Sequence, residues 1–421
     1  MKFLIICLIF LSATIEAKLK IEISQGSKDL AKIAIVPFSD GKKTNIALSD
    51  LIEKNLTLFG EFKATPKNEM LSFPSSEDNF FYRDWNILKI DYAVIGNLEE
   101  KNNSEFYIEY FVFNVPLKKL ILRGDITGDI NELSQISKVI SNRTYKAITG
   151  LEGIFNTKLA YILNPKKEIY KICVSDIDGS NEQILFESTA PLMSPSWSSD
   201  NKKLAYVSFE KGYPEIYMQD LFSGKRESIK TLGLSNSAPV WSPDNKKLAF
   251  VMSMSGNPDI YIYDLRNKKI SRHTTHYGID TEPSWSPNSK KLLFTSNRSG
   301  SPQIYELTIS SNRIKRITLD GDYNARASYF PNGKDIVLVH GNNGIFHIGT
   351  KKIRSRFINT ISKTTLDESP TISPNGNIII YATKNNSQGY LAGLTLDGKS
   401  KFTLPTKFGS VREPAWSPLM N

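Results

Sequence analysis

The sequence has few of the residues that build cross-links, metal centres and nucleophilic sites. Its 421 residues include two cysteines and four histidines. Cys7 lies in an apolar N-terminal run, which leaves Cys173 as a lone thiol that forms no internal disulfide. Neither the Gly-x-Ser-x-Gly motif of α/β-hydrolases nor the His-Glu-x-x-His motif of zinc peptidases is present. We therefore expect a protein that depends on its apolar core and binds no cofactor.

Long hydrophobic runs are also missing. Residues 3–13 form an apolar run, which is shorter than the roughly 18 to 20 residues that span a bilayer. The run follows the basic Lys2 and precedes the small residue Ala17, which is the order found in signal peptides. Cys7 lies inside the run rather than at its end, unlike a lipid-attachment cysteine. We expect residues 1–17 to be a cleaved signal peptide and the exported chain to have no integral membrane segment.

Basic residues outnumber acidic ones. The net charge is +10, and removal of the signal peptide takes away Lys2 and Glu16 and leaves this value unchanged. A basic protein is a candidate for binding nucleic acid. Export separates the chain from nucleic acid, so we expect no such partner. The excess charge is instead expected on particular surfaces of the fold.

One motif repeats with a period of 43 or 44 residues. Its first copy reads PSWSSD from Pro195, and the third position of the copies falls at Trp197, Trp241, Trp285, Tyr329, Ile372 and Trp416. Repeats of about 40 to 50 residues with several short strands are typical of β-propellers, whose four-stranded blades pack on their neighbours. We expect the large apolar residue to wedge between blades and the Ser-Pro pair to set the turn that follows.

Six blades are predicted, because the second strand of the repeat recurs at Leu159, Leu204, Leu248, Leu292, Ile336 and Ile379. The blade that contains Leu159 has no motif strand in front of it. The last motif copy, residues 414–418, supplies this strand from the C-terminus, which closes the ring and leaves only protected edges. We assign residues 154–421 to a six-bladed propeller that is closed by a C-terminal strand.

Residues 18–153 show an alternation of strands and helices instead. Strands are expected at residues 33–38 and 92–97, and residues 106–115 and 117–126 read as a hairpin. Residues 44–58 carry an apolar helical face that ends before Gly60, and Asn131 is predicted to cap a last helix. No glycine-rich phosphate loop occurs. The predicted fold class is an α/β N-terminal domain followed by an all-β propeller.

The two ends of the ring are predicted to differ in charge. Every first strand runs toward the motif turn, so all these turns lie at one end, and they carry Lys158, Lys202, Lys203, Lys246, Lys247, Lys290, Lys291 and Lys334. The loops that enter the inner strands surround the channel mouth at the other end, and they contain Asp280, Thr281, Glu282, Asp367, Glu368, Arg412 and Glu413. Loops at such a mouth commonly hold a ligand or a peptide. Solvated loop residues are the alternative.

An enzyme is the main alternative class. A propeller enzyme, such as a polysaccharide lyase or a peptidase-like hydrolase, needs histidines or carboxylates that converge on the channel. His273 and His276 have no carboxylate at ligand spacing. Asp367 and Glu368 are adjacent, so on a strand they point to opposite faces and share no proton. These residues favour a non-enzymatic protein, and a purely structural secreted propeller would not need the N-terminal domain.

The repeat occurs together with a particular set of other segments. These are residues 19–38 (LKIEISQGSKDLAKIAIVPF), 91–98 (DYAVIGNL), 154–162 (IFNTKLAYI), 281–305 and 412–419 (REPAWSPL). In this order they resemble the TolB family, the periplasmic propeller proteins of the Tol-Pal system of Gram-negative envelopes. The resemblance covers the whole chain after the signal peptide, whereas the repeat alone also occurs in peptidase lids and other propellers.

The resemblance implies a non-enzymatic periplasmic adaptor that serves outer-membrane integrity and constriction during cell division. Its channel mouth would bind the peptidoglycan-associated lipoprotein Pal and the translocation segments of certain colicins. Thr281 and Glu282 belong to the family's Thr-Glu-Pro-x-Trp motif, Ala238 to the matching Ala-Pro motif, and Ser235 stands where some relatives carry histidine. TolA would bind the N-terminal segment, which comprises Lys18, Leu19, Lys20, Ile21, Glu22 and Ile23 and alternates like a half-buried strand.

Overall fold

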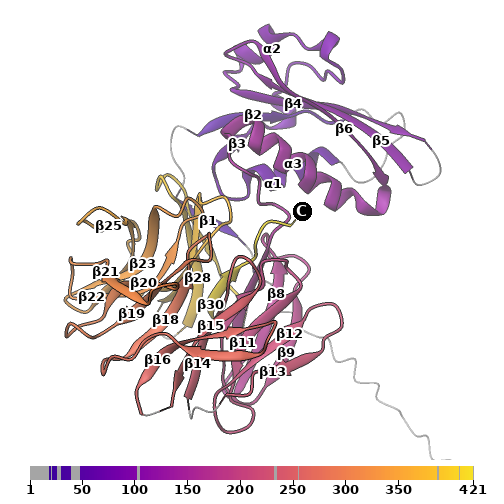
Figure 1. Cartoon of the computed structure of the whole chain (residues 1–421). Helices are drawn as coiled ribbons and strands as arrows, with labels where there is room; N and C mark the ends of the chain where they lie inside the picture. Colours follow the sequence, from indigo (N-terminus) through magenta and orange to yellow (C-terminus); the bar gives the residue numbers. More distant parts are fainter. Residues whose placement is uncertain are drawn as a thin grey trace, which may run out of the picture.

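An α/β domain stands on one end of a β-propeller (Figure 1). The computed structural model describes residues 19, 21–25, 30–38, 48–101, 105–231, 235–254, 256–385, 388–406 and 408–420. Both parts of the predicted fold class are confirmed. The predicted signal peptide, residues 1–17, lies outside the described residues, and so do Lys18 and Lys20.

The N-terminal sheet has the strand order β3-β2-β4-β5-β6. Its strands are β2 (Ala31–Ile35), β3 (Phe62–Ala64), β4 (Tyr92–Glu100), β5 (Glu105–Asn114) and β6 (Lys119–Asp129). β2 pairs in parallel with β3 and β4, whereas β4, β5 and β6 pair antiparallel. The predicted hairpin is therefore present as β5 and β6, and the short β3 is a strand that the sequence does not predict.

Helices cover both faces of this sheet. They are α1 (Leu48–Thr57), α2 (Tyr82–Ile87) and α3 (Leu133–Thr149), with short 3-10 helices η1 (Lys67–Glu69), η2 (Glu77–Asn79) and η3 (Ile130–Glu132). Successive residues of a strand point to opposite faces. Val94 thus joins Ile52 of α1 and Ile140 of α3 in one core, while Ile95 packs with Trp85 of α2 in the other.

The predicted cap of the last helix is wrong. Asn131 lies within η3, and its backbone N–H donates to Oδ1 of Asp129 (2.8 Å). Asp129 therefore accepts a hydrogen bond from one of the free N–H groups at the start of this helical segment, which is the capping role predicted for Asn131. At the other end, Gly150 stops α3 in the left-handed conformation, with φ of 77°.

The propeller consists of six four-stranded sheets within the described residues, each read here from the channel outward. Blade one is β30 (Ser410–Trp416), β7 (Lys158–Lys166), β8 (Ile169–Asp176) and β9 (Gln183–Ser188), blade two is β10 (Leu192–Trp197), β11 (Lys203–Ser208), β12 (Glu215–Asp220) and β13 (Arg226–Ser228), and blade three is β14 (Ser235–Trp241), β15 (Lys247–Ser253), β16 (Pro258–Asp264) and β17 (Lys269–Arg272). Blade four is β18 (Asp280–Trp285), β19 (Lys291–Ser296), β20 (Gln303–Thr308) and β21 (Arg313–Arg316), blade five is β22 (Tyr323–Tyr329), β23 (Asp335–Asn342), β24 (Ile345–Lys352) and β25 (Asn359–Thr360), and blade six is β26 (Glu368–Ile372), β27 (Ile378–Asn385), β28 (Gln388–Thr395) and β29 (Lys401–Leu404). One further strand, β1 (Glu22–Gln25), extends blade six at its outer edge.

The motif tryptophans wedge between blades, as predicted. The indole Nε1 of Trp197 donates to the carbonyl oxygen of Ala415 in blade one (2.9 Å), and that of Trp285 donates to Val240 in blade three (3.1 Å). In the turn that follows, the hydroxyl of Ser198 accepts a backbone N–H bond from across the turn (2.8 Å). The motif therefore supplies both the contact between blades and the turn at the end of each inner strand.

The ring closes through its C-terminal strand, as predicted. β30 pairs antiparallel with β7, with Trp416 opposite Leu159 and Arg412 opposite Ile162. The indole Nε1 of Trp416 donates to Oγ1 of Thr157 (2.8 Å). Blade one thus combines strands from the start and from the end of the propeller sequence. β30 covers the inner edge of β7, which would otherwise be unpaired.

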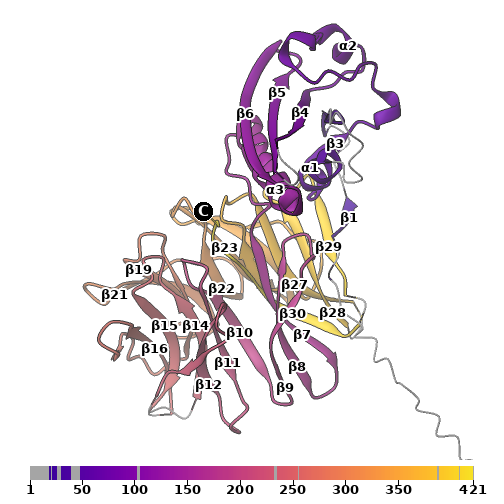
Figure 2. The ribbon, with the colours of Figure 1, turned by 90° about the vertical axis from the view of Figure 1, so that its right-hand side faces the viewer.

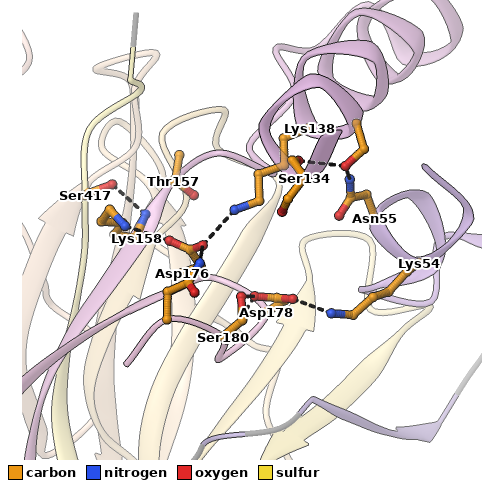
Figure 3. Close-up of polar contacts among 12 residues, drawn as sticks. Lys54, Asn55, Ser134, Lys138, Thr157, Lys158, Asp176, Asp178, Ser180 and Ser417 are labelled. Atoms are coloured by element: carbon orange, nitrogen blue, oxygen red, sulfur yellow. Dashed lines mark hydrogen bonds and ion pairs between the residues drawn. The ribbon is translucent and has the colours of Figure 1, made fainter. Parts of the chain in front are cut away.

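Ion pairs connect the N-terminal domain to blade one (Figure 3). Nζ of Lys138 in α3 lies 2.7 Å from Oδ2 of Asp176, and Nζ of Lys54 in α1 lies 2.5 Å from Oδ2 of Asp178. The side chains of Lys138 and Asp176 are 7% and 4% exposed, so solvent screens their attraction little. Burial alone would raise the pKa of Asp178, but hydrogen bonds from Lys54 and Ser180 lower it to about 2.

A half-buried carboxyl group, that of Glu61, lies at the same boundary between the domains. Its Oε1 accepts hydrogen bonds from the hydroxyl of Tyr145 in α3 (3.0 Å) and from Nδ2 of Asn377 in blade six (2.6 Å). Burial has the largest effect, and together with the nearby charge of Asp397 it raises the pKa of Glu61 to about 7, although the two hydrogen bonds act in the opposite direction. The folded protein therefore holds a proton here that an unfolded chain releases at lower pH.

Ring closure can be tested at Trp416. We expect Trp416→Ala to lower the free energy of unfolding by about 3 to 5 kcal/mol, the range for truncating a large buried aromatic side chain. Thermal melting followed by circular dichroism measures the effect. Phe222→Ala is the control, because the Phe222 side chain is 83% exposed and should contribute little. Equal melting temperatures for Trp416→Ala and the unaltered protein would contradict closure through β30.

The Glu61 carboxyl group predicts a pH-dependent stability. The pKa of Glu61 is higher in the folded state than in the unfolded chain. The protonated group therefore contributes its full stabilisation below about pH 4.5, and this contribution is lost as the pH rises to about 7. At pH 8 we expect Glu61→Gln to be more stable than the unaltered protein, by at most about 3 kcal/mol. At pH 4.5 the difference should be small.

Melting temperatures of both proteins between pH 4.5 and pH 8 measure this difference. Glu152→Gln is the matched control, because the Glu152 side chain is 52% exposed and pairs with Lys146 at the surface. The control should follow the unaltered protein at every pH. If the curve for Glu61→Gln also runs parallel to that of the unaltered protein, the role assigned to Glu61 is wrong.

Candidate partner-binding site

Every inner strand bends at a β-bulge where it enters the channel. The register shifts at this point in all six blades, and one residue in each bulge takes a positive φ between 48° and 54°. These residues, which we call the bulge ring, are Ser194, Ala238, Glu282, Arg326, Ser369 and Glu413. All six line one cavity of about 580 Å³ in the channel. Bulges turn a side chain away from its regular direction and are common next to binding sites.

A charged network spans the bulge ring. Nε of Arg326 lies 2.7 Å from Oε1 of Glu282, and Oε2 of Glu282 accepts from the hydroxyl of Thr295 (2.8 Å) and from the backbone N–H of Arg326 (3.0 Å). Arg326 also donates to the hydroxyl of Ser369. Burial opposes the charge of Arg326, but the neighbouring carboxylates, first Glu282 and then Glu413, raise the pKa of its guanidinium group. The predicted site residue Glu282 is therefore held in one position, by an arginine that the sequence analysis does not single out.

The other predicted acidic residues divide into buried and exposed groups. Asp280 is fully buried and pairs with Nη2 of Arg298 (2.7 Å), and Asp367 is 1% exposed and accepts a hydrogen bond from Ser362. These two carboxylates support the mouth loops from inside and are almost inaccessible to solvent. Glu413 is also buried, and its Oε2 accepts from the backbone N–H of a bulge-ring residue in blade two (2.6 Å).

The remaining predicted mouth residues are accessible. Glu368 and Ser235 are exposed, whereas Thr281, Ala238 and Arg412 are half-buried. Glu368 and Asp367 also line a smaller cavity of about 270 Å³, together with bulge-ring residues.

Exposed apolar side chains surround the channel mouth. The loops that enter the inner strands carry Tyr277, Ile279, Leu319, Leu366 and Phe408, which we call the apolar rim. Tyr277 is 86% exposed and Leu319 is 63% exposed. Three hairpins at the same end add the exposed residues Tyr213, Met254 and Ile345. Exposed apolar groups that gather in this way mark an interaction surface.

The loop that carries Tyr277 is held by hydrogen bonds. Nδ2 of Asn257 donates to the carbonyl oxygens of His276 (2.6 Å) and Gly278 (3.1 Å), and Nδ1 of His276 accepts from the backbone N–H of Gly278 (2.9 Å). The backbone N–H of Ile279 donates to Asn297 (2.7 Å). His276 therefore shapes the loop. A preformed loop loses less conformational entropy when a partner binds.

The N-terminal segment docks on its own propeller (Figure 2). β1 pairs antiparallel with β29, with Glu22 opposite Thr403 and Ile23 opposite Phe402. Leu19 is fully buried, and its backbone packs so closely on Gly179 that a side chain on that glycine would overlap it. Of the predicted segment, Glu22 and Ile23 lie in a strand, whereas Leu19 and Ile21 precede it. The predicted alternation holds in part, because Leu19 is buried and Ile23 is half exposed.

Comparison with known proteins matches both domains. A family model described as the TolB beta propeller domain matches residues 145–420, and one described as the TolB amino-terminal domain matches residues 19–121. The Tol-Pal system protein TolB of Marinomonas sp. (strain MWYL1) is 52% identical over 420 residues, which cover 98% of this chain and 96% of the relative. The protein of the same name from Alcanivorax borkumensis is 45% identical over 96% of this chain and 94% of its own.

The same likeness extends to a solved structure. The crystal structure of TolB from Acinetobacter baumannii has a TM-score of 0.88 and 36% identity with this chain, and covers 96% of this chain and 100% of its own. Among the described residues, no helix combines the length and apolar character that crossing a membrane would require. The family models and the relatives agree over nearly the whole chain, and we conclude that it belongs to the TolB family of Tol-Pal system proteins.

Proposed function

We propose that this protein is a non-enzymatic periplasmic adaptor that binds the lipoprotein Pal at the channel mouth and TolA through residues 18–23. The observation that carries the proposal is the combination of the bulge ring with the apolar rim at one end of the channel. Names of the relatives place them in the Tol-Pal system. An adaptor between an outer-membrane lipoprotein and an inner-membrane protein would serve outer-membrane integrity and constriction during division.

The mouth suits a protein partner better than a reaction. Its apolar rim offers large side chains around a charged centre, the arrangement of a protein interface with anchor residues and a fixed ion pair. Asp280 and Asp367 could act as acids or bases, but Asp280 forms an ion pair with Arg298 and Asp367 accepts a hydrogen bond from Ser362. The extended translocation segments of certain colicins could enter the same mouth, because the cavity of about 580 Å³ continues into the channel.

The docked state of β1 supports the second half of the proposal. Its main-chain pairing with β29 is the kind of contact that an incoming partner strand can replace. A partner that takes the segment must release it from blade six. Any change that Pal binding makes in this docking equilibrium would then alter TolA binding by the same factor, since coupling between two sites is reciprocal.

The apolar rim predicts where binding energy is concentrated. We expect Tyr277→Ala combined with Leu319→Ala to weaken binding of the Pal protein from the same organism by roughly thirtyfold or more, because truncated anchor residues cost about 2 kcal/mol or more. Isothermal titration calorimetry measures the affinity. Lys246→Ala combined with Lys290→Ala, at the opposite end of the ring, is the control and should leave affinity nearly unchanged. Stronger loss in the control than in the rim variant would show that Pal binds elsewhere.

The N-terminal segment gives a separate test. A mature protein without residues 18–27 should lose TolA binding, whereas Pal binding should survive or change in affinity. Calorimetry with each partner distinguishes the two effects. An internal control replaces Ser24 with alanine, which removes only its hydrogen bond to the carbonyl oxygen of Lys401 (3.1 Å). Full TolA affinity in the truncated protein would rule out the proposed role of this segment.

A further inference from the structure

A second hollow lies at the turn end of the ring, away from the channel mouth. It is a cleft of about 640 Å³ between blades five and six. Blade five contributes Phe330 and Phe357, blade six contributes Leu396, and the N-terminal domain contributes Leu151 just after α3. Leu396 and Leu151 are 41% and 38% exposed, so part of the cleft wall is apolar and open to solvent.

A buried cation forms part of the floor. Lys351 is 2% exposed, and its Nζ donates to the carbonyl oxygens of Lys352 (3.1 Å), Ile353 (3.4 Å) and Ser355. No carboxylate forms an ion pair with it in the part of the chain that the structure describes. Burial, and then the charge of Lys315, lower the pKa of Lys351. A cation that is buried against carbonyl groups alone is costly, and an anion in the cleft would reduce that cost.

The rim of the cleft is also basic. Lys315, Lys334, Lys352, Arg354 and Arg356 are exposed, and none of them forms an ion pair with a described residue. Lys352 ends β24, and Arg354 and Arg356 follow it in the hairpin that leads to β25, at the outer edge of the propeller (Figure 1). Phe357, on the same hairpin, is 79% exposed. Among the described residues that line the cleft, Asp335 is the one carboxylate, and it accepts a hydrogen bond from Asn332 (2.7 Å).

We propose that this cleft binds an extended acidic peptide segment of a partner protein, with one large apolar side chain between Phe357 and Leu396 and carboxylates on the basic rim. The basic rim favours an anionic ligand, and the apolar part of the cleft wall favours an apolar side chain next to the anionic groups. The cleft is concave and is lined by both domains, with Leu151 from the N-terminal domain, which fits a chain better than the flat surface of a bilayer. Because the cleft lies at the end of the ring opposite the mouth, this site does not depend on the proposed Pal site.

Fluorescence anisotropy of the full mature protein tests the proposal with two labelled probes, a polyglutamate peptide with one central leucine and the same peptide with glycine in that place. The leucine peptide should bind, more weakly as salt is added. The glycine peptide should bind about tenfold more weakly, because it leaves the apolar walls unfilled. The triple variant Lys352→Gln, Arg354→Gln, Arg356→Gln should bind the leucine peptide about tenfold more weakly or worse, since several exposed ion pairs are lost together.

The matched control is Lys246→Gln, Lys247→Gln, Lys290→Gln, which removes the same charge from blades three and four. It should bind the leucine peptide within about twofold of the unaltered protein. Melting curves should show that both triple variants fold, because the altered side chains lie at the surface. An equal loss of affinity for the leucine peptide in both variants would show that only the net charge matters and would overturn the proposal. So would equal binding of the two peptides, or binding to anionic phospholipid vesicles that needs the hairpin residues while neither peptide binds.

Discussion

The pairing of β30 with β7 is the contact on which the rest of the molecule depends. It turns an open row of sheets into a ring, and Trp416 of β30 also contacts the N-terminal domain. The hydroxyl of Ser417 accepts from the backbone N–H of Lys158 (2.9 Å), and Nδ2 of Asn156 donates to the carbonyl oxygen of Met420 (2.9 Å). The ring of Phe59 lies 6.2 Å from that of Trp416. Trp416 therefore takes part both in closure of the ring and in the packing of the N-terminal domain on the propeller.

The architecture could be predicted because it depends on spacing. A blade needs a large side chain against its neighbour at a constant interval, and Trp197, Trp241 and Trp285 report that interval directly. Local detail could not be predicted in the same way. The six-residue α2 is too short to show a helical period, and its Trp85 is buried by side chains from β5 that no local pattern identifies. Asp129 and Asn131 are both good capping residues, and the end of β6 decides between them.

The candidate site could be predicted in position but only partly in chemistry. The place of Glu282 in the repeat located the channel entrance, yet the burial of Asp280 depends on Arg298, which comes from another loop. Arg326 occupies the bulge position that glutamate holds in two other blades, so an alignment of the copies at this position would have found it. The apolar rim could not be predicted from the charge pattern of the loops, and no local period marks Tyr277 as exposed.

The fifth strand of blade six has a further consequence, for colloidal stability. While β1 is paired, it covers the backbone of β29 along residues 401–403 on that side. Departure of β1 leaves a bare sheet edge with the sequence KFTL, which contains one charge and two large apolar residues. Such an edge is a template for pairing between identical molecules, and a single lysine gives limited protection. If the segment binds a partner as we propose, its docking on β29 also protects copies of the protein from pairing with one another, so we expect the partner strand to arrive as β1 leaves.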